Sequence, residues 1–129
     1  TFAYQLAKSE RCKNIFVAPG NAGTAAIATN VALSVTDFAA IEKCVVENHI
    51  NMVIVGPEDP LVKGITNYFA ETPSLKKVQI IGPSKRGALL EGSKERAKEF
   101  MVAHNIPTAA YASFTKATRG HVEREVWRC

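Results

Sequence analysis

The sequence predicts an α/β fold in which helices flank a parallel sheet. Three short apolar runs, at residues 14–18, 51–55 and 78–81, each lead into a turn rich in Pro and Gly. A helical pattern begins a few residues after each turn, and repeated strand–loop–helix units are typical of parallel sheets. Because open parallel sheets bind ligands at the carboxyl ends of their strands, these turns are the predicted ligand loops.

The first third of the chain is predicted to hold a helix followed by two strands. Residues 1–9 repeat apolar side chains at helical spacing, which predicts a helix that is already under way. Residues 14–18 are apolar on both faces, as expected for a buried parallel strand. Residues 25–28 favour a short helical turn, and residues 31–35 favour a second, weaker strand.

The middle of the chain is predicted to hold a helix, a strand and a second helix, and the second helix has the strongest start signal in the sequence. Thr36 or Asp37 caps a helix whose apolar face is made of Phe38, Ile41, Cys44 and Val45. Residues 51–55 form the clearest strand. Asp59 is expected to cap the next helix, with Pro60 in its first position. The apolar face of that helix is made of Leu61, Ile65 and Phe69.

The next part of the chain continues the alternation of strands and helices. Residues 78–81 form a strand, and Ser84 caps a short helix after it. Gly92 interrupts this helix, and Ser93 caps a longer one whose apolar face is made of Ala97, Phe100, Met101 and His104. Residues 109–112 favour a last short strand.

The composition fits one domain that handles a small phosphorylated molecule. The 129 residues are enough for a hydrophobic core, and 47% of them are apolar, which argues against global disorder. Sixteen basic and twelve acidic residues give a net charge of +4. Because Lys and Arg are scattered, no nucleic-acid partner is expected. No apolar stretch is long enough to cross a bilayer, so no membrane partner is expected either.

The cysteines indicate a reducing compartment. They lack the paired spacing of a zinc site or a disulfide framework, and stand at positions Cys12, Cys44 and Cys129. No signal peptide precedes the first element, so we expect reduced thiols and a cytoplasmic protein. The three histidines lie far apart in the sequence, and no metal or catalytic role is expected for them.

The first turn has the composition of a loop that holds an anion. Residues 19–24 read Pro-Gly-Asn-Ala-Gly-Thr. Glycine lets the backbone approach a ligand closely, and successive N–H groups can point at phosphate oxygens. Thr24 adds a hydroxyl at the expected start of a helix. A tight strand–helix turn without a ligand has the same composition, so both interpretations stay open.

Two further positions carry groups that suit a sugar or a nucleotide. Glu58 follows the clearest strand, and its carboxylate can accept hydrogen bonds from an amine or a ribose hydroxyl. Lys94 lies at an expected helix start, where free N–H groups and a full positive charge favour a phosphate. A solvated loop carboxylate and an ordinary surface lysine are the respective alternatives.

Four blocks of the sequence, taken together, carry a family resemblance. They are residues 16–24, 54–61, 81–85 and 90–94. In composition and order they resemble the amino-terminal domain of phosphoribosylamine–glycine ligase, also called glycinamide ribonucleotide synthetase, and the set is far more specific than any single motif. The resemblance implies a Rossmann-like, pre-ATP-grasp domain over residues 1–116, followed by a tail, residues 117–129, that does not match the family.

The resemblance also implies an activity. Enzymes of this family join glycine to 5-phosphoribosylamine in de novo purine biosynthesis, through a glycyl phosphate, with ATP and Mg²⁺ (or Mn²⁺). Such an enzyme must neutralise phosphate charge and hold the amine beside the acyl phosphate. The implied partners are therefore 5-phosphoribosylamine, glycine, ATP and an ATP-grasp domain.

By matching position, the resemblance assigns roles to residues of this chain. Lys94 matches the lysine that approaches the ATP phosphates in the ATP-grasp superfamily. No catalytic residue and no metal ligand is assigned. The positions that match the phosphoribosylamine site are Pro19, Gly20, Asn21, Gly23, Thr24, Gly56, Pro57 and Glu58.

Two departures from the family pattern predict a fragment. The family begins with a central strand and a Gly-rich loop before the helix that opens this chain, and an ATP-grasp domain should follow. Neither is found in the sequence, so the chain is expected not to turn over alone. A parent with one activity or with several stays open, as do a non-catalytic phosphometabolite-binding module and an inactive truncated remnant.

Overall fold

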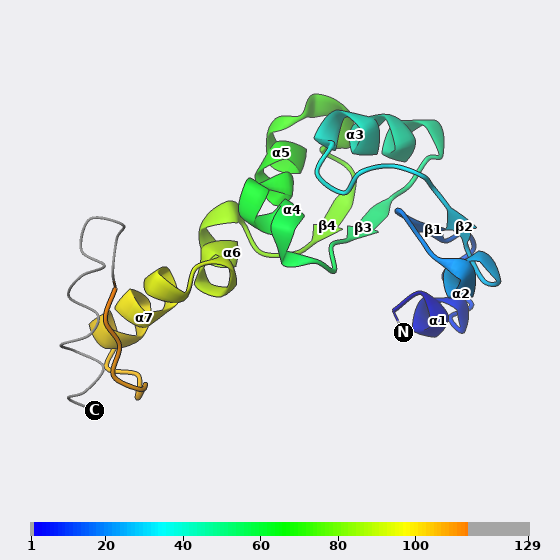
Figure 1. The fold of residues 1–129 in the computed structure, drawn as a ribbon. Helices are drawn as coiled ribbons and strands as arrows, with labels where there is room; N and C mark the ends of the chain where they lie inside the picture. The colour runs from blue at the N-terminus through cyan, green and yellow to red at the C-terminus, as the bar shows by residue number, and fades with distance from the viewer. Residues whose placement is uncertain (1, 114–129) are drawn as a thin grey trace.

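The computed structural model describes residues 2–113. Its elements are, in order, α1 (Phe2–Ala7), β1 (Phe16–Val17), α2 (Ala22–Ala25), β2 (Thr29–Asn30), α3 (Phe38–Glu47), β3 (Met52–Ile54), α4 (Glu58–Lys63), α5 (Ile65–Glu71), the 3₁₀ helix η1 (Pro73–Leu75), β4 (Gln79–Ile81), α6 (Lys85–Gly92) and α7 (Lys94–Ala103). In Figure 1, β3 and β4 lie near the centre with α3, α4 and α5 around them. The β1–β2 pair lies beside α2, and α6 and α7 extend away on the other side. The predicted tail, residues 117–129, lies outside the described residues.

All described strands pair in parallel, as the sequence predicts. β1 pairs with β2, with Phe16 opposite Thr29, and β3 pairs with β4, with Met52 opposite Gln79. Within residues 2–113 these are two separate two-stranded sheets, because β1 and β3 are not hydrogen-bonded to each other. The predicted class, parallel strands flanked by helices, is confirmed, whereas the single continuous sheet is not seen in this part of the chain.

The second strand lies earlier than predicted. β2 precedes residues 31–35, which form no strand. The ladder ends where the Val31 N–H donates to the Val17 carbonyl at 2.9 Å. The chain then turns, since the Asp37 N–H donates to the Ser34 carbonyl at 3.1 Å. The β-branched residues of this segment are therefore used to connect β2 to α3.

The predicted last strand is not formed either. Residues 109–112 have no strand conformation, although they lie within the described chain. Lys98 on α7 instead holds this segment, because its Nζ donates to Thr108 Oγ1 at 2.5 Å and to the Ala109 carbonyl at 3.1 Å. A strand needs a neighbour with free backbone groups, and these residues fold back on a helix.

Side-chain caps fix the starts of three helices. Asp37 Oδ1 accepts the Ala40 N–H at 3.0 Å, so Asp37 and not Thr36 caps α3. Ser84 caps α6 and Ser93 caps α7, each accepting a backbone N–H at 3.3 Å. These two predictions are confirmed, because a serine directly before a helical segment satisfies a donor that the helix leaves free.

The start of α4 differs from the prediction. Pro57 occupies the capping position without a side-chain hydrogen bond, so Asp59 is not the cap. Its Oδ2 instead pairs with Lys63 Nζ at 3.0 Å, one turn later. Glu58 and Asp59 both lie in the first turn, where the helix dipole favours negative charge. Pro60 is then buried inside α4 and not at its first position.

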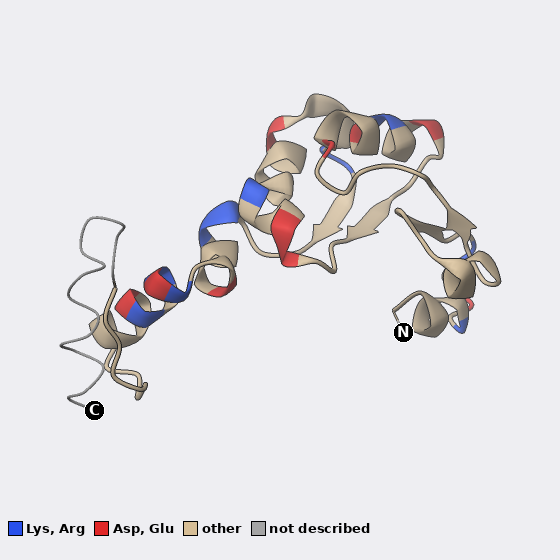
Figure 2. Cartoon of the chain, viewed as in Figure 1, with Lys and Arg blue, Asp and Glu red and all other residues tan. Residues whose placement is uncertain are grey.

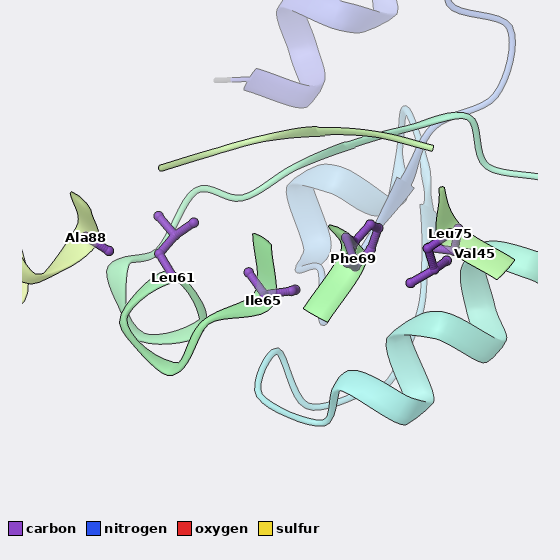
Figure 3. Close-up of a cluster of buried hydrophobic side chains, with 6 residues drawn as sticks. All are labelled: Val45, Leu61, Ile65, Phe69, Leu75 and Ala88. Carbon is purple, nitrogen blue, oxygen red and sulfur yellow. The ribbon is translucent and has the colours of Figure 1, made fainter. Parts of the chain in front are cut away.

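The hydrophobic core lies between α3, α4, α5 and α6 and the β3–β4 pair (Figure 3). Leu61, Ile65 and Phe69, whose four-residue spacing predicts an apolar face, are 7%, 3% and 2% exposed. Gly64 divides the predicted single helix into α4 and α5, and its φ of +98° suits a residue without a side chain. The buried set is Val45, Leu61, Ile65, Phe69, Leu75 and Ala88.

A carboxylate joins three elements at the edge of this core. Glu42 on α3 accepts hydrogen bonds from the Tyr68 hydroxyl of α5 at 2.6 Å and from Ser74 Oγ of η1 at 2.5 Å. Phe38 packs against the Tyr68 ring, with centroids 5.5 Å apart. The Ser74 and Tyr68 hydrogen bonds lower the pKa of Glu42, and the bond to Glu42, with burial, raises the pKa of Tyr68. The bridge therefore needs an ionised Glu42 and a protonated Tyr68.

We predict that acid weakens this bridge. The folded pKa of Glu42 lies below its ordinary 4.5. The stabilisation of the fold by ionised Glu42 is therefore complete above about pH 4.5 and is lost as the pH falls through the folded pKa. The folded pKa of Tyr68 is raised above its ordinary 10.0. The stabilisation of the fold by the protonated hydroxyl is therefore present below pH 10.0 and is lost as the pH rises through the folded pKa. Glu42→Gln should lower the thermal midpoint by a few degrees at pH 7, and by less at pH 3. Circular dichroism melts check this; an equal loss at both pH values contradicts it.

Candidate functional site

The first predicted loop is organised by hydrogen bonds between its own residues. Asn21 caps α2, with its Oδ1 accepting the Thr24 N–H at 3.0 Å. Thr24 Oγ1 in turn accepts the Asn21 N–H at 2.8 Å, which completes a reciprocal capping box. The helix thus begins at Ala22, and Thr24 lies inside its first turn and not ahead of it. Asn21 and Gly23 remain exposed.

Asn30, which sequence analysis missed, holds this loop from β2. Its Oδ1 accepts the Thr24 hydroxyl at 2.7 Å, and its Nδ2 donates to the Asn21 carbonyl at 2.8 Å. It also covers Gly20, since a Cβ on Gly20 would stand 2.2 Å from Asn30 Cγ. Gly20 has φ +79° and follows the cis Ala18–Pro19 peptide. The sequence signal for Asn30 is only an amide residue directly before the predicted strand at residues 31–35.

The two loops that follow β3 and β4 lie side by side. The Val55 N–H donates to the Ile81 carbonyl at 3.1 Å, so Gly56 and Gly82 leave the same edge of the β3–β4 pair. Gly82 lies against Leu61, because a Cβ there would stand 2.6 Å from Leu61 Cδ2. Gly56 has no neighbour within 4 Å of such a position. The backbone at Gly56 is therefore open to a ligand, whereas that at Gly82 is packed.

The loop after β4 is fixed to α5. Thr66 Oγ1 donates to the Pro83 carbonyl at 2.9 Å, and Asn67 Oδ1 accepts the Lys85 N–H at 2.9 Å. Lys85 also packs along Gly64. Sequence analysis missed Thr66 and Asn67, which lie in a helix and have no turn-like composition. These two hydrogen bonds hold the loop after β4 beside α5, at the edge of the β3–β4 pair where the strands end.

The charged residues near these loops are distributed along α4 and α6. Glu58 is exposed at the first position of α4, beside Asp59. Figure 2 shows this acidic start of α4, and basic residues at the start of α6, where Lys85 and Arg86 stand. Lys94 is exposed at the first position of α7. Glu58 and Lys94 are thus both available to solvent, on different elements.

The structure brings only part of the predicted site together. Pro57 and Glu58 adjoin the loop after β4, whereas residues 19–24 belong to the other strand pair. Two hollows of the described chain, of about 290 and 200 Å³, lie elsewhere. The first is lined by residues such as His49 and Lys77, at the edge of β3 and β4 opposite the predicted site. The second is lined by residues of α5, η1 and β4. The predicted site residues form open loops and not a closed pocket.

The described residues show no metal-binding cluster. Within residues 2–113, no three His, Cys, Asp or Glu side chains are placed so that they could share an ion. None of the helices in that range is long and apolar enough to cross a bilayer.

Comparison with known proteins identifies relatives of the chain. The family model for "Phosphoribosylglycinamide synthetase, N domain" matches residues 1–91. A phosphoribosylamine–glycine ligase of Halalkalibacterium halodurans is 42% identical over 127 residues, which cover 97% of this chain and 29% of that protein. Its Escherichia coli K12 counterpart is 44% identical over 116 residues, 88% of this chain and 26% of that protein. The human trifunctional purine biosynthetic protein adenosine-3 is 45% identical over 118 residues, 90% of this chain and 11% of that protein. The chain thus spans less than a third of the length of these relatives.

Proposed function

From the premise that this chain belongs to the phosphoribosylglycinamide synthetase N-domain family, we propose that it forms the phosphoribosylamine-binding part of a phosphoribosylamine–glycine ligase. The observation that carries the proposal is 42–45% identity to such ligases across 88% or more of the chain. The activity belongs to the whole ligase, of which this chain corresponds to about a quarter. A cytoplasmic location follows from the same proposal, since the substrates are soluble metabolites.

The geometry of the first loop supports a role in holding the sugar phosphate. Its backbone is fixed before any ligand arrives, because Asn21, Thr24 and Asn30 bond to one another. Gly20 lets the loop pass close to Asn30, since a Cβ there would stand 2.2 Å from Asn30 Cγ. A turn that is fixed before binding holds an anion at little ordering cost; because the Asn21 and Thr24 N–H groups are occupied in the capping box, the phosphate is proposed to meet the other N–H groups of the loop.

The loop after β3, which belongs to the other strand pair, supplies a second proposed contact with the substrate. Gly56 and Pro57 leave the backbone open at the strand end, and Glu58 places an exposed carboxylate there. A carboxylate accepts hydrogen bonds from a ribose hydroxyl or from the amine of phosphoribosylamine. The amine must remain free to attack the activated glycine, so Glu58 is proposed to orient the sugar and not to hold the amine tightly.

ATP and its metal ion belong to the proposal for the whole ligase. ATP would supply the phosphate that activates glycine, with Mg²⁺ or Mn²⁺ as its counter-ion. The residues of this chain that the structure describes lack an acidic cluster to hold that ion, so no step is assigned to a metal here. Lys94, at the start of the ten-residue α7, is proposed to contact an ATP phosphate.

A chimaera tests the proposed function. In it, the aligned segment of this chain replaces the matching segment of the Escherichia coli K12 ligase, whose own flanking residues are kept. We expect ADP release that depends on both glycine and phosphoribosylamine, at a kcat within about tenfold of the parent. A folded chimaera that binds ATP but never responds to phosphoribosylamine contradicts the proposal.

Lys94→Ala is predicted to act on ATP alone. In the chimaera the substitution should raise the KM for ATP about tenfold, because one charge–phosphate contact contributes roughly 1–2 kcal/mol, and leave the KM for phosphoribosylamine unchanged. Steady-state kinetics with each substrate varied in turn measure both values. Lys77→Ala, at the opposite edge of β3–β4, is the matched control and should change neither. Equal KM values for ATP in the Lys94 and Lys77 variants contradict the role.

A further inference from the structure

The threonine hydroxyl of the first loop is already committed to protein groups. A hydroxyl has one hydrogen to donate and two lone pairs that accept. Thr24 Oγ1 lies 2.7 Å from Asn30 Oδ1 and 3.0 Å from the Asn21 carbonyl oxygen. That carbonyl already accepts the Ala25 N–H at 3.0 Å and Asn30 Nδ2 at 2.8 Å. The Thr24 hydroxyl therefore donates to Asn30, and no hydrogen remains on it for a phosphate oxygen.

The same oxygen also fixes the backbone at the start of the loop. Thr24 Oγ1 accepts the Asn21 N–H at 2.8 Å, so it accepts from the loop and donates to β2. A hydrogen bond that is accepted and one that is donated by the same hydroxyl polarise each other and are strengthened together. Asn30, Thr24 and the Asn21 backbone thus form a closed set of hydrogen bonds, which we call the loop ring.

Asn30 is a rigid support for the loop ring, because β1 holds the backbone on both sides of it. The Thr29 N–H donates to the Ile15 carbonyl at 2.8 Å, and the Val31 N–H donates to the Val17 carbonyl at 2.9 Å. These two bonds fix Asn30 to the strand from which the first loop leaves. A side chain on a paired strand places its partners more precisely than a side chain on a loop. The loop ring therefore ties the first loop to the β1–β2 pair.

An amide suits position 30 better than a carboxylate of the same size. Oδ1 of Asn30 accepts the hydrogen bond from the Thr24 hydroxyl, and Nδ2 donates one to the Asn21 carbonyl. Asparagine combines acceptor and donor in one short flat group, whereas an ionised aspartate accepts only. A carboxylate at position 30 would face the Asn21 carbonyl oxygen with no hydrogen between them. Asn30→Asp should therefore open the loop ring as Asn30→Ala does.

We infer that Asn30 is a positioning residue for the substrate of the first loop, and that Thr24 acts on this substrate through Asn30 and not by direct contact. The inference rests on the proposed function, which names phosphoribosylamine as the substrate. Thr24 stands at a position that the family resemblance matches to the substrate site, and Asn30 does not. The hydrogen bonds of the loop ring assign both residues to one task, which is to hold the loop backbone in place.

A double-mutant cycle in the chimaera tests the inference. Thr24→Val, Asn30→Ala and Asn30→Asp should each raise the KM for phosphoribosylamine about tenfold and leave kcat within about twofold, because the loop is proposed to bind a part of the substrate away from the reacting amine. Thr24→Val with Asn30→Ala should raise this KM by no more than about threefold beyond either single variant, since both break the same ring. Effects that multiply to about a hundredfold would reveal an independent contact of Thr24 with the substrate and overturn the inference.

Two further variants complete the cycle. Thr24→Ser keeps the hydroxyl and both of its hydrogen bonds, so it should restore the KM for phosphoribosylamine to within about threefold of the parent chimaera. A Thr24→Ser variant as impaired as Thr24→Val would contradict a role for the hydroxyl. Asn51→Ala is the matched control for Asn30→Ala, because Asn51 is an exposed amide at the edge of β3–β4 opposite the predicted site. It should change neither KM nor kcat.

Amide hydrogen exchange in the 129-residue chain gives a second readout, which needs neither substrate nor chimaera. Asn30→Ala should speed exchange of the Asn21 N–H at least tenfold, because the Thr24 hydroxyl that accepts it is no longer held. The Val55 N–H, which donates to the Ile81 carbonyl in the other strand pair, should exchange within about twofold of the parent rate. Unchanged exchange at Asn21, or equal acceleration at Val55, would overturn the inference.

The two readouts separate failure of the inference from failure of the proposed function. If Gly20→Ala raises the KM for phosphoribosylamine and Asn30→Ala does not, the loop binds the substrate without help from Asn30, and the inference alone is overturned. If neither substitution changes this KM while Asn30→Ala still speeds exchange at Asn21, Asn30 shapes a loop that does not bind phosphoribosylamine. That result contradicts the proposed function, and the inference with it.

Discussion

Replacing Phe69 with alanine is expected to lower the free energy of unfolding by about 3–5 kcal/mol, the usual cost of removing a buried aromatic ring. Phe69 is 2% exposed and lies in the middle of the buried cluster, between Ile65 and Leu75 (Figure 3). The total stability of a domain this size is about 5–15 kcal/mol. The loss is therefore a large fraction of that total.

Phe100→Ala is the matched control for this prediction. It removes the same ring from a side chain that is 42% exposed, and the loss should stay below about 1 kcal/mol. Urea unfolding of both variants, followed by circular dichroism, gives the two free energies. A Phe69→Ala loss no larger than that of Phe100→Ala would mean that the cluster around α5 is not the core.

Gly20→Ala is expected to raise the KM for phosphoribosylamine at least tenfold in the chimaera. Gly20 has φ +79°, and a Cβ there would stand 2.2 Å from Asn30 Cγ and Oδ1. Asn30 must move, which breaks its hydrogen bonds to Thr24 and to the Asn21 carbonyl. The loop then loses the fixed shape that the proposed phosphate site needs, whereas the KM for ATP should not change.

Gly56→Ala is the comparison for Gly20→Ala. No atom beyond its chain neighbours lies within 4 Å of the added methyl group, so the fold should be unaffected, and any rise in the KM for phosphoribosylamine would come from contact between the methyl group and the ligand. Kinetics on both variants, with melting curves to confirm folding, measure the difference. If Gly20→Ala leaves the KM for phosphoribosylamine unchanged, the first loop does not bind this substrate.

The parts of the fold that the sequence predicts well are those decided by neighbouring residues. Leu61, Ile65 and Phe69 share a face by helical spacing, and all three are buried. Ser84 and Ser93 stand directly before helical segments and cap them. Both signals depend on contacts within one or two turns of chain, which a single sequence contains.

The failures are at positions where the preference of a residue competes with another contact. Asp59 has the residue type and position expected of a helix cap. In the structure it pairs with Lys63 one turn later, and α4 begins at Glu58. The β-branched residues 31–35 suit a strand, yet the ladder with β1 ends at Val31. Propensity describes a residue alone, whereas a strand requires a partner.

The candidate site shows the same limit. Composition identifies residues 19–24 and 56–58, because Gly and Pro mark turns after apolar runs. It does not identify Asn30, which shapes the first loop from nine residues away. Nor does it indicate that the two strand pairs are separate within residues 2–113. Long-range contacts of this kind become visible only in three dimensions.

The central claim, that the first loop and the loop after β3 bind the ribose 5-phosphate part of the substrate, is tested most directly by nuclear magnetic resonance. Amide spectra of the 129-residue chain are recorded during titration with ribose 5-phosphate, a stable stand-in for phosphoribosylamine, and with ribose. Saturable shifts are expected with the phosphate compound, and none with ribose, at Gly20, Asn21, Gly23, Thr24, Gly56 and Glu58. Shifts confined to residues around His49 and Lys77, or no shifts at millimolar ligand, would contradict it.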